Sequence, residues 1–461
     1  MSKELKEKLF LSRKHTAKKM ADGEINTAFG FCDDYKNFLD NAKTEREACS
    51  FVEALAIEQG YEVFDSKKKY NAGDKVYYMN RGKSIILARF GKKCVCEGVR
   101  IVAAHVDSPR LDLKPNPLYE DSEIAFLKTH YYGGIKKYQW PALPLALHGR
   151  VFRADGSFVD VNIGEDENDP VFVVTDLLPH LGAEQMKLPL SEGIKAESLN
   201  LLVGSLPFKD SEEAESVKLN IMNILNEKYG IVEEDFVTAE LEAVPAIKAK
   251  DVGFDRSLIG SYGHDDRVCS YPATRAIFDC EDPEYTCITV LTDKEEIGSE
   301  GNTGLKAAYL KYFIEDLAAM VGVPARDVMR KSLCLSADVN AAHDPNYPDV
   351  LERRNAAEIN KGVVITKYTG ARGKSDTSDA SAEYMSKVIC MLRNNGVAWQ
   401  TGELGRIDLG GGGTVAKYIA NLDIDVVDVG VPVLSMHAPY EVVSKLDVYS
   451  AYQAFKVFFE K

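Results

Sequence analysis

The stretch Leu291-Thr-Asp-Lys-Glu-Glu-Ile-Gly-Ser-Glu300 decides how this chain is interpreted. Its two adjacent carboxylates, Glu295 and Glu296, follow an apolar run over residues 287–291. A buried strand over this run would place both acids at its carboxyl end, where α/β sheets gather ligand-binding residues. A pair of acids alone is more typical of a solvated loop. It becomes informative because other apolar strand patterns in the chain also end at residues of metal-ligand type.

Composition sets the first bounds on function. A chain of 461 residues is too long for one ordinary core, so we expect two domains or a large insertion. A net charge of −15 argues against nucleic acid or an anionic membrane as a partner. We find no apolar run long enough for a membrane span and no secretory signal. Nine scattered cysteines indicate reduced thiols and a cytoplasmic location.

The chain divides into three stretches that differ in their pattern of predicted helices and strands. Helix and strand patterns alternate over 1–108 and again over 256–461, which predicts an α/β fold with a mixed central sheet flanked by helices. Residues 109–255 instead contain short strand patterns broken by turn residues, which predicts an inserted β-rich domain. Within the first stretch, Thr44 and Glu47 form a capping-box pattern ahead of a helix.

Several residues of metal-ligand type lie at or just beyond the predicted strand ends. Two imidazoles with three carboxylates suit a pair of zinc-like divalent ions, with one carboxylate bridging them. Two cations about 3.5–4 Å apart activate a shared water and polarise a carbonyl. Each residue alone has an ordinary explanation, such as a structural histidine, a helix cap or a turn, but all share one topological position. The candidate ligands are His105, Asp265, Glu296, Asp338 and His437.

Two further acids are candidates for supporting roles. Asp107 lies two residues beyond His105, close enough in an extended segment to bond the free ring nitrogen and set its tautomer. If Glu296 is a ligand, Glu295 is free to act as a general base. We hypothesise that Glu295 takes the proton from the attacking water and passes it to the leaving amine.

Five segments occur together in the chain: Ala104-His105-Val-Asp107-Ser-Pro-Arg110, Asp265-Asp-Arg267, Asp293-Lys-Glu295-Glu296-Ile-Gly-Ser-Glu300, Ser336-Ala-Asp338 and Ser435-Met-His437. With these segments in this order, the sequence resembles the aspartyl aminopeptidase and vacuolar aminopeptidase I family of dinuclear zinc exopeptidases. The resemblance implies that His105 and Asp338 bind one metal ion, that Glu296 and His437 bind the other, and that Asp265 bridges them. It also implies that Glu295 is the general base and that Asp107 orients the first histidine.

The resemblance extends to architecture and assembly. It implies a zinc-exopeptidase-like catalytic domain built from 1–108 and 256–461, with 109–255 serving dimerisation and assembly. It implies a tetrahedral homododecamer whose active sites face an interior chamber. His180, in the context Leu178-Pro-His180-Leu181, would reach a neighbouring subunit's active site and stabilise the tetrahedral intermediate. The ordinary alternative for His180 is a surface residue after a strand.

The sequence departs from the family pattern in ways that bear on specificity. The stretch Ala341-Ala-His343-Asp344-Pro shifts a histidine that the family places differently, and Asp-Asp-Arg stands where aspartyl enzymes often have Asp-Asn. Arg372 and Lys374 could hold an acidic P1 side chain, so a preference for N-terminal Asp or Glu and a broader or neutral preference both stay open.

We therefore predict an aminopeptidase with two divalent metal ions, zinc first and cobalt or manganese as alternatives. It would release N-terminal residues from peptides by attack of a metal-bridged hydroxide. Two other functions are alternatives. One is a deacylase or carboxypeptidase on the same sheet and metals. The other is a catalytically inactive scaffold or peptide-binding homologue, which loss of Glu295 or a ligand would have indicated.

Overall fold

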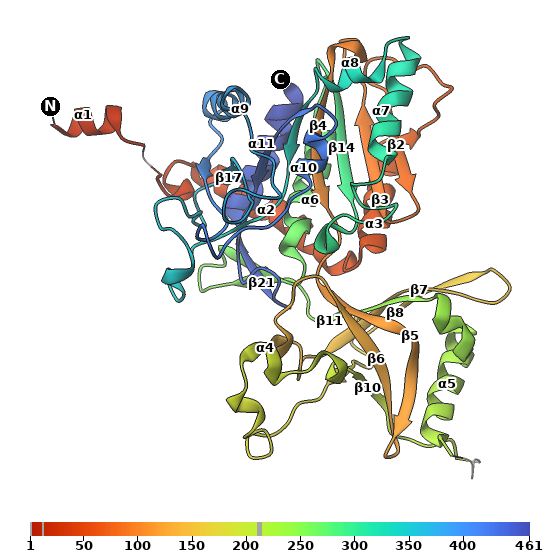
Figure 1. Cartoon of the computed structure of the whole chain (residues 1–461). Helices are drawn as coiled ribbons and strands as arrows, with labels where there is room; N and C mark the ends of the chain where they lie inside the picture. Colours follow the sequence, from red (N-terminus) through yellow and green to blue (C-terminus); the bar gives the residue numbers. More distant parts are fainter. Residues whose placement is uncertain (1, 12, 210–213) are drawn as a thin grey trace.

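The computed structural model describes residues 2–11, 13–209 and 214–461. The strands of these residues form three sheets, of nine, seven and five strands. Figure 1 shows two lobes, with the nine-stranded sheet and most helices in one and the seven-stranded sheet in the other.

The nine-stranded sheet is mixed and carries the core of the larger lobe. Its strands are β1 (Glu62–Val63), β2 (Lys75–Asn80), β3 (Ser84–Arg89), β4 (Val99–His105), β14 (Thr286–Thr292), β15 (Leu333–Ser336), β17 (Val363–Thr366), β18 (Trp399–Thr401) and β19 (Asp425–Gly430). They lie in the order β1-β2-β3-β14-β4-β15-β19-β17-β18. The neighbours β14, β4 and β15 are parallel, so their carboxyl ends share one edge. Every residue of β4 and β14 is buried, as expected for strands covered on both faces.

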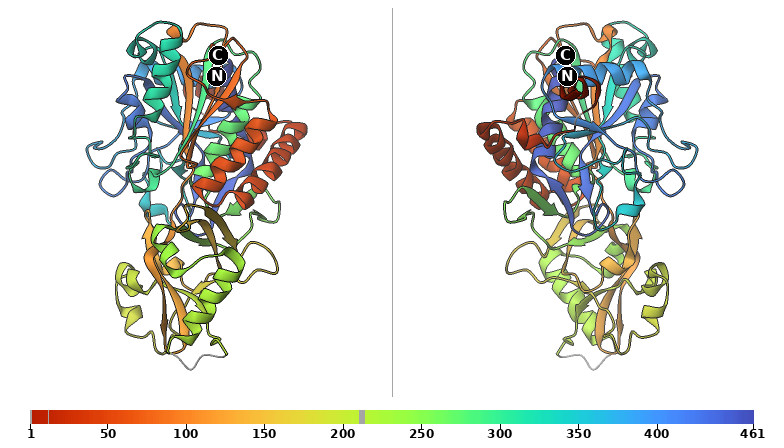
Figure 2. Two further views of the ribbon diagram at one scale, coloured as in Figure 1. Left: turned by 90° about the vertical axis from the view of Figure 1, so that its right-hand side faces the viewer. Right: turned by 90° about the vertical axis from the view of Figure 1, so that its left-hand side faces the viewer.

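Helices cover both faces of this sheet (Figure 2). One hydrophobic cluster contains residues of α2 (Asp22–Asn41), α3 (Glu45–Glu58), α6 (His264–Phe278), α9 (Ala382–Asn394) and α11 (Lys445–Glu460). The cluster on the other face contains residues of α7 (Tyr309–Met320), α8 (Ala325–Met329) and α10 (Ala416–Ala420). The predicted mixed sheet flanked by helices is confirmed. Helix α1 (Ser2–Leu9) lies apart from the main body in Figure 1.

The seven-stranded sheet is antiparallel and forms the second lobe. Its strands are β5 (Arg110–Asp121), β6 (Ile124–Tyr132), β7 (Leu145–Phe152), β8 (Phe158–Ile163), β9 (Val173–Val174), β10 (Leu201–Gly204) and β11 (Glu240–Pro245), in the order β8-β7-β11-β5-β6-β10-β9. Helix α5 (Ser216–Tyr229) packs on this sheet through Val217 and its neighbours. The short helix α4 (Leu190–Gly193) belongs to the same lobe in Figure 1.

The five-stranded sheet joins segments that are far apart in the sequence. Its strands are β12 (Lys250–Val252), β13 (Leu258–Ser261), β16 (Asn340–Ala341), β20 (Pro432–Leu434) and β21 (Glu441–Ser444), in the order β12-β13-β21-β20-β16. Between β19 and β20 the chain changes sheets next to Gly430. A Cβ at Gly430 would lie 1.6 Å from the Asp338 carbonyl oxygen, so the close passage requires glycine.

Shorter elements complete the fold. The 3-10 helices are η1 (Thr16–Lys18), η2 (Val95–Glu97), η3 (Lys137–Gln139), η4 (Gln185–Lys187), η5 (Ala196–Ser198), η6 (Glu233–Thr238), η7 (Glu295–Ile297) and η8 (Pro348–Val350). The predicted capping box is confirmed, because Thr44 caps α3 and exchanges hydrogen bonds with Glu47. Among the described residues, no helix combines the length and apolar character needed to cross a membrane.

Candidate metal centre

Three predicted ligands lie together because three parallel strands end together. His105 is the last residue of β4, Glu296 lies in η7 just after β14, and Asp338 follows β15 by two residues. Since β14 and β15 flank β4 in parallel register, these side chains emerge at one edge of the sheet. Carboxyl edges of parallel strands are where α/β folds place their ligands.

The other two predicted ligands reach this edge from loops. Asp265 lies at the start of α6 with non-helical backbone angles, and His437 follows β20 with φ of 64°. The buried Glu441 carboxylate holds both segments, because it accepts the Asp265 N–H at 3.0 Å and the His437 N–H at 2.7 Å. One side chain thus fixes two backbones that come from distant parts of the sequence.

The five side chains form two groups that share one member. His105, Asp265 and Asp338 make the first group, and Asp265, Glu296 and His437 make the second, with the candidate ligand atoms of each within 4.8 Å of one another. Asp265 Oδ1 lies 3.1 Å from His105 Nε2, whereas Oδ2 lies 3.2 Å from His437 Nε2. The two oxygens of Asp265 therefore face different groups, as in a bridging carboxylate.

The charge of this cluster fits divalent cations. The Glu296 side chain is only 4% exposed, and its Oε1 is buried with no hydrogen-bond partner among the described residues. Burial, together with the Asp265 charge, raises the pKa of Glu296 well above its ordinary value. Burial and the charge of Asp266 do the same to the pKa of Asp338. Buried carboxylates crowded in this way need cations as partners, so the residues present fit the zinc-type ions that their chemistry predicts.

Asp107 connects the first histidine with the two adjacent glutamates. His105 Nδ1 lies 3.0 Å from the Asp107 carbonyl oxygen and 3.3 Å from its Oδ1. The Asp107 carboxylate also accepts the N–H groups of Glu295 and Glu296, at 3.1 Å and 3.2 Å. With Nδ1–H donating to Asp107, the Nε2 lone pair of His105 faces Asp265 and Asp338.

The predicted general base lies next to this centre. Glu295 is partly buried and belongs to neither group. Burial, with the negative charges of Asp107 and Asp265, raises the pKa of Glu295 to about 7. A carboxylate with a pKa near neutrality is well matched to accept a proton and return it.

His180 is placed away from these residues. It is exposed, in a turn between β9 and α4 of the second lobe, and belongs to neither group. Lys374, the candidate for binding an acidic P1 side chain, is paired with Asp379 at 2.9 Å and lies over the Tyr368 ring at 3.9 Å.

Sequence reasoning missed several groups that support the centre. Glu441 lies four residues beyond His437, and this spacing was the only signal for it in the sequence. Tyr132, Gly133 and Gly134, at the end of β6, also contact centre residues. The two glycines carry no side-chain donor that could have indicated a role.

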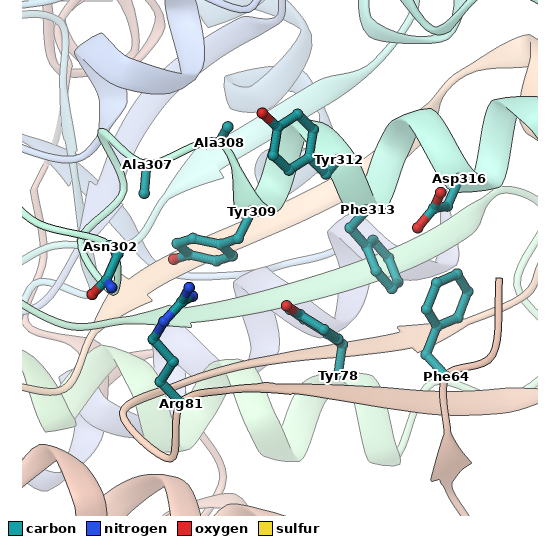
Figure 3. Close-up of a pocket in the computed structure, with 10 residues that line it drawn as sticks. All are labelled: Phe64, Tyr78, Arg81, Asn302, Ala307, Ala308, Tyr309, Tyr312, Phe313 and Asp316. Carbon is teal, nitrogen blue, oxygen red and sulfur yellow. The ribbon is translucent and has the colours of Figure 1, made fainter.

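A separate hollow of about 360 Å³ lies beside α7 (Figure 3). Its aromatic walls are Phe64, Tyr78, Tyr309, Tyr312 and Phe313. None of the five ligand-type residues is among the described residues that line it. It is therefore distinct from the candidate metal centre.

The fold and the paired groups define the class of metal-dependent hydrolases. Residues 38–459 match the family described as aminopeptidase I zinc metalloprotease (M18), and the chain belongs to this family. A probable M18 family aminopeptidase 1 from Clostridium acetobutylicum is 49% identical over 448 residues, which cover 95% of this chain and 96% of the relative. The chain is thus a zinc metallo-aminopeptidase, and the resemblance and enzyme class predicted from the sequence are confirmed.

Solved structures agree with this assignment. The crystal structure of an M18 family aminopeptidase from Thermotoga maritima matches with a TM-score of 0.93 at 43% identity, covering 98% of this chain and 100% of that one. A structure of the S. cerevisiae mApe1 dodecamer has the same fold, with a TM-score of 0.76 at 21% identity over 95% of this chain and 97% of that one.

Proposed function

We propose that five residues bind two divalent metal ions, zinc first, with cobalt or manganese as alternatives. His105 and Asp338 would hold one ion, Glu296 and His437 would hold the other, and Asp265, which belongs to both groups, would contribute to each. The observation that carries the assignment is that the two Asp265 oxygens face different histidines, at 3.1 Å and 3.2 Å. When bound, such a pair of ions activates water and polarises the scissile carbonyl.

In this proposal the protein supplies the proton transfers. Glu295, which belongs to neither ligand group, accepts the proton of the attacking water and delivers it to the nitrogen of the leaving amine. Asp107 holds the His105 ring and both glutamate backbones, so the base and the ligands keep one geometry. The free α-amine of the peptide binds near the second group and its acids, which restricts cleavage to the first residue.

We further propose that residues 109–255 form an assembly domain and that 1–108 and 256–461 form the catalytic domain. The likeness to the mApe1 dodecamer supports a homododecamer. Tetrahedral symmetry is the part of this proposal that rests on the family resemblance of the sequence alone. The exposed position of His180 suits a residue that reaches the active site of a neighbouring subunit and stabilises the tetrahedral intermediate. Nine free cysteines support a cytoplasmic location.

Hydrolysis of aminoacyl-anilides tests the function directly. The wild-type protein, stripped with EDTA and reloaded with zinc, cobalt or manganese, should be inactive when stripped and active when reloaded. Glu295→Gln should retain its metal but lose at least about 10²-fold in kcat. Glu300→Gln is the matched control, because Glu300 is an exposed acid of the same loop. Full activity after stripping would contradict the metal assignment, and a fully active Glu295→Gln would contradict the general base.

The same assay tests the choice of P1 residue. Comparing Asp- and Glu-anilides with Leu- and Ala-anilides distinguishes an acidic from a neutral preference. If Lys374 binds the acidic side chain, it must exchange its partner Asp379 for the substrate. Lys374→Met should then raise KM for acidic substrates only. An equal effect on all substrates would exclude this role.

Subunit mixing tests the role of His180. His180→Ala should lower turnover with unchanged metal content. Mixed oligomers of His180→Ala and Glu295→Gln subunits should recover activity, because some sites then combine an intact histidine with an intact base. No recovery in oligomers shown to be mixed would exclude a site shared between subunits.

A further inference from the structure

The end of strand β6 belongs to the second lobe, but it contacts the second group of the metal centre directly and reaches the first group through Asp107. The Tyr132 hydroxyl donates to Asp107 Oδ2 at 2.7 Å. The Gly134 carbonyl oxygen accepts the His437 Nδ1–H at 2.8 Å. Between them, Gly133 lies so close to Glu296 that a Cβ there would be 3.2 Å from Glu296 Oε2. Three consecutive residues thus touch three different residues of the centre.

The contact of Tyr132 acts on the first group through Asp107. The Asp107 carboxylate already accepts two backbone N–H groups and lies 3.3 Å from His105 Nδ1. A further hydrogen bond from a phenol restrains the rotation of this carboxylate and hence of the His105 ring. Tyr132 is itself held firmly, because it is buried and the Arg110 guanidinium lies 3.9 Å from its ring centroid.

The contact of Gly134 acts on the second group through His437. A hydrogen bond from Nδ1–H to a carbonyl fixes the tautomer with Nε2 free. That Nε2 is the atom 3.2 Å from Asp265 and 3.5 Å from Glu296. The His437 side chain is 35% exposed, so packing alone would restrain its ring only weakly. The hydrogen bond to the Gly134 carbonyl therefore fixes the orientation of the ring.

We propose that Tyr132–Gly134 is a positioning element by which the second lobe sets the metal affinity of both groups. Both are positioning residues rather than catalytic ones, because Tyr132 acts on His105 through Asp107 and Gly134 acts on His437 directly. This inference rests on the proposed function, since it assumes that His105 and His437 bind metal. It gives the second lobe a role within its own subunit's active site, separate from assembly.

Removal of one hydroxyl tests the first contact. Tyr132→Phe should keep the ring and its packing but weaken zinc binding by up to about 10-fold, the lower end of the range for groups that bond a ligand directly, because Tyr132 acts one hydrogen bond further out. Zinc affinity is measured by competition with a chelating dye, together with metal content per subunit. At saturating zinc, kcat should fall with little change in KM, because orientation and not substrate binding is altered. Tyr131→Phe, the half-exposed neighbour on the same strand, is the matched control.

A single methyl group tests the second contact. A Cβ at Gly134 would lie 3.2 Å from His437 Nδ1, and Gly134 is outside the left-handed region, so alanine fits the backbone. Gly134→Ala should therefore displace the His437 ring and weaken zinc binding in the same assay. The unfolding midpoint of the metal-free protein, measured in parallel, shows whether the variant still folds like the wild type.

The outcomes separate this inference from the proposed function. Zinc affinity and kcat of Tyr132→Phe and Gly134→Ala equal to wild type would overturn the positioning role. A lower unfolding midpoint without weaker zinc binding would overturn it as well, because the contacts would then be structural only. If the wild type binds no zinc at these residues, the proposed function fails and the inference fails with it. Weaker zinc binding in both variants, with Tyr131→Phe unchanged, supports it.

Discussion

Glu295 and Glu296 are neighbours in sequence but have different surroundings. Glu296 Oε1 lies 3.5 Å from His437 Nε2 within the second group, whereas Glu295 belongs to neither group. The Asp107 carboxylate accepts the backbone N–H groups of Glu295 and Glu296, so the backbone of this loop is fixed without using either glutamate side chain. One acid is therefore available to bind a cation while the other is available to move a proton.

The buried Glu441 is the residue whose loss we expect to loosen the centre most. Glu441→Ala leaves the N–H groups of Asp265 and His437 without their acceptor, and an unsatisfied buried donor costs about 1–3 kcal/mol. Since two donors lose their acceptor, the free energy of unfolding of the metal-free protein should fall by up to about twice that amount, as measured in urea. An unchanged value would mean that other groups or water replace the carboxylate.

At the scale of elements, the sequence indicates the ends of strands better than the order of strands. The apolar runs that become β4, β14 and β15 are visible in the sequence, and so are the ligand-type residues that follow them. The parallel order β14-β4-β15 depends on pairing between distant segments, which local periodicity does not report. For the same reason the contacts of Glu441 with Asp265 and of Tyr132 with Asp107 could not be predicted, since each joins segments more than 20 residues apart.

The start of α3 tests whether the capping box predicted from the sequence stabilises the protein. Thr44→Ala removes the hydroxyl that accepts the Glu47 N–H at 3.2 Å, and loss of such a cap costs about 1 kcal/mol. Thr44→Ser keeps an accepting hydroxyl, so it should recover most of that stability. Equal destabilisation by both variants would show that the buried methyl group, and not the cap, is what matters. Urea unfolding of the metal-free protein measures both.

At the scale of the whole molecule, the two lobes are joined by buried ionic contacts. His148 of β7 lies 2.7 Å from Glu47 of α3 through Nδ1 and 3.1 Å from Glu165 through Nε2. Glu165 in turn pairs with Lys43 at 2.6 Å. These contacts hold the second lobe against the larger one, in addition to the contact of Tyr132 with Asp107 at the end of β6.

The His148 contacts make stability depend on pH. Burial acts to lower the pKa of His148, but its hydrogen bonds to Glu165 and Glu47 raise it above the ordinary value. A raised folded-state pKa stabilises the fold fully below the unfolded value of about 6.5, and this contribution is lost as pH rises through the folded pKa. The wild type should therefore exceed His148→Gln in unfolding midpoint at about pH 6, with the difference shrinking at higher pH. A difference independent of pH would show that His148 acts by packing alone.

Metal content per subunit tests the central claim most directly, namely that Asp265 is shared by two metal-binding groups. Elemental analysis after equilibrium dialysis against zinc should give two ions per wild-type subunit. Asp338→Ala should retain the ion held by Glu296 and His437, whereas Asp265→Ala should lose both. A fully active wild type with a single ion, or an Asp265→Ala variant that keeps two, would contradict the account.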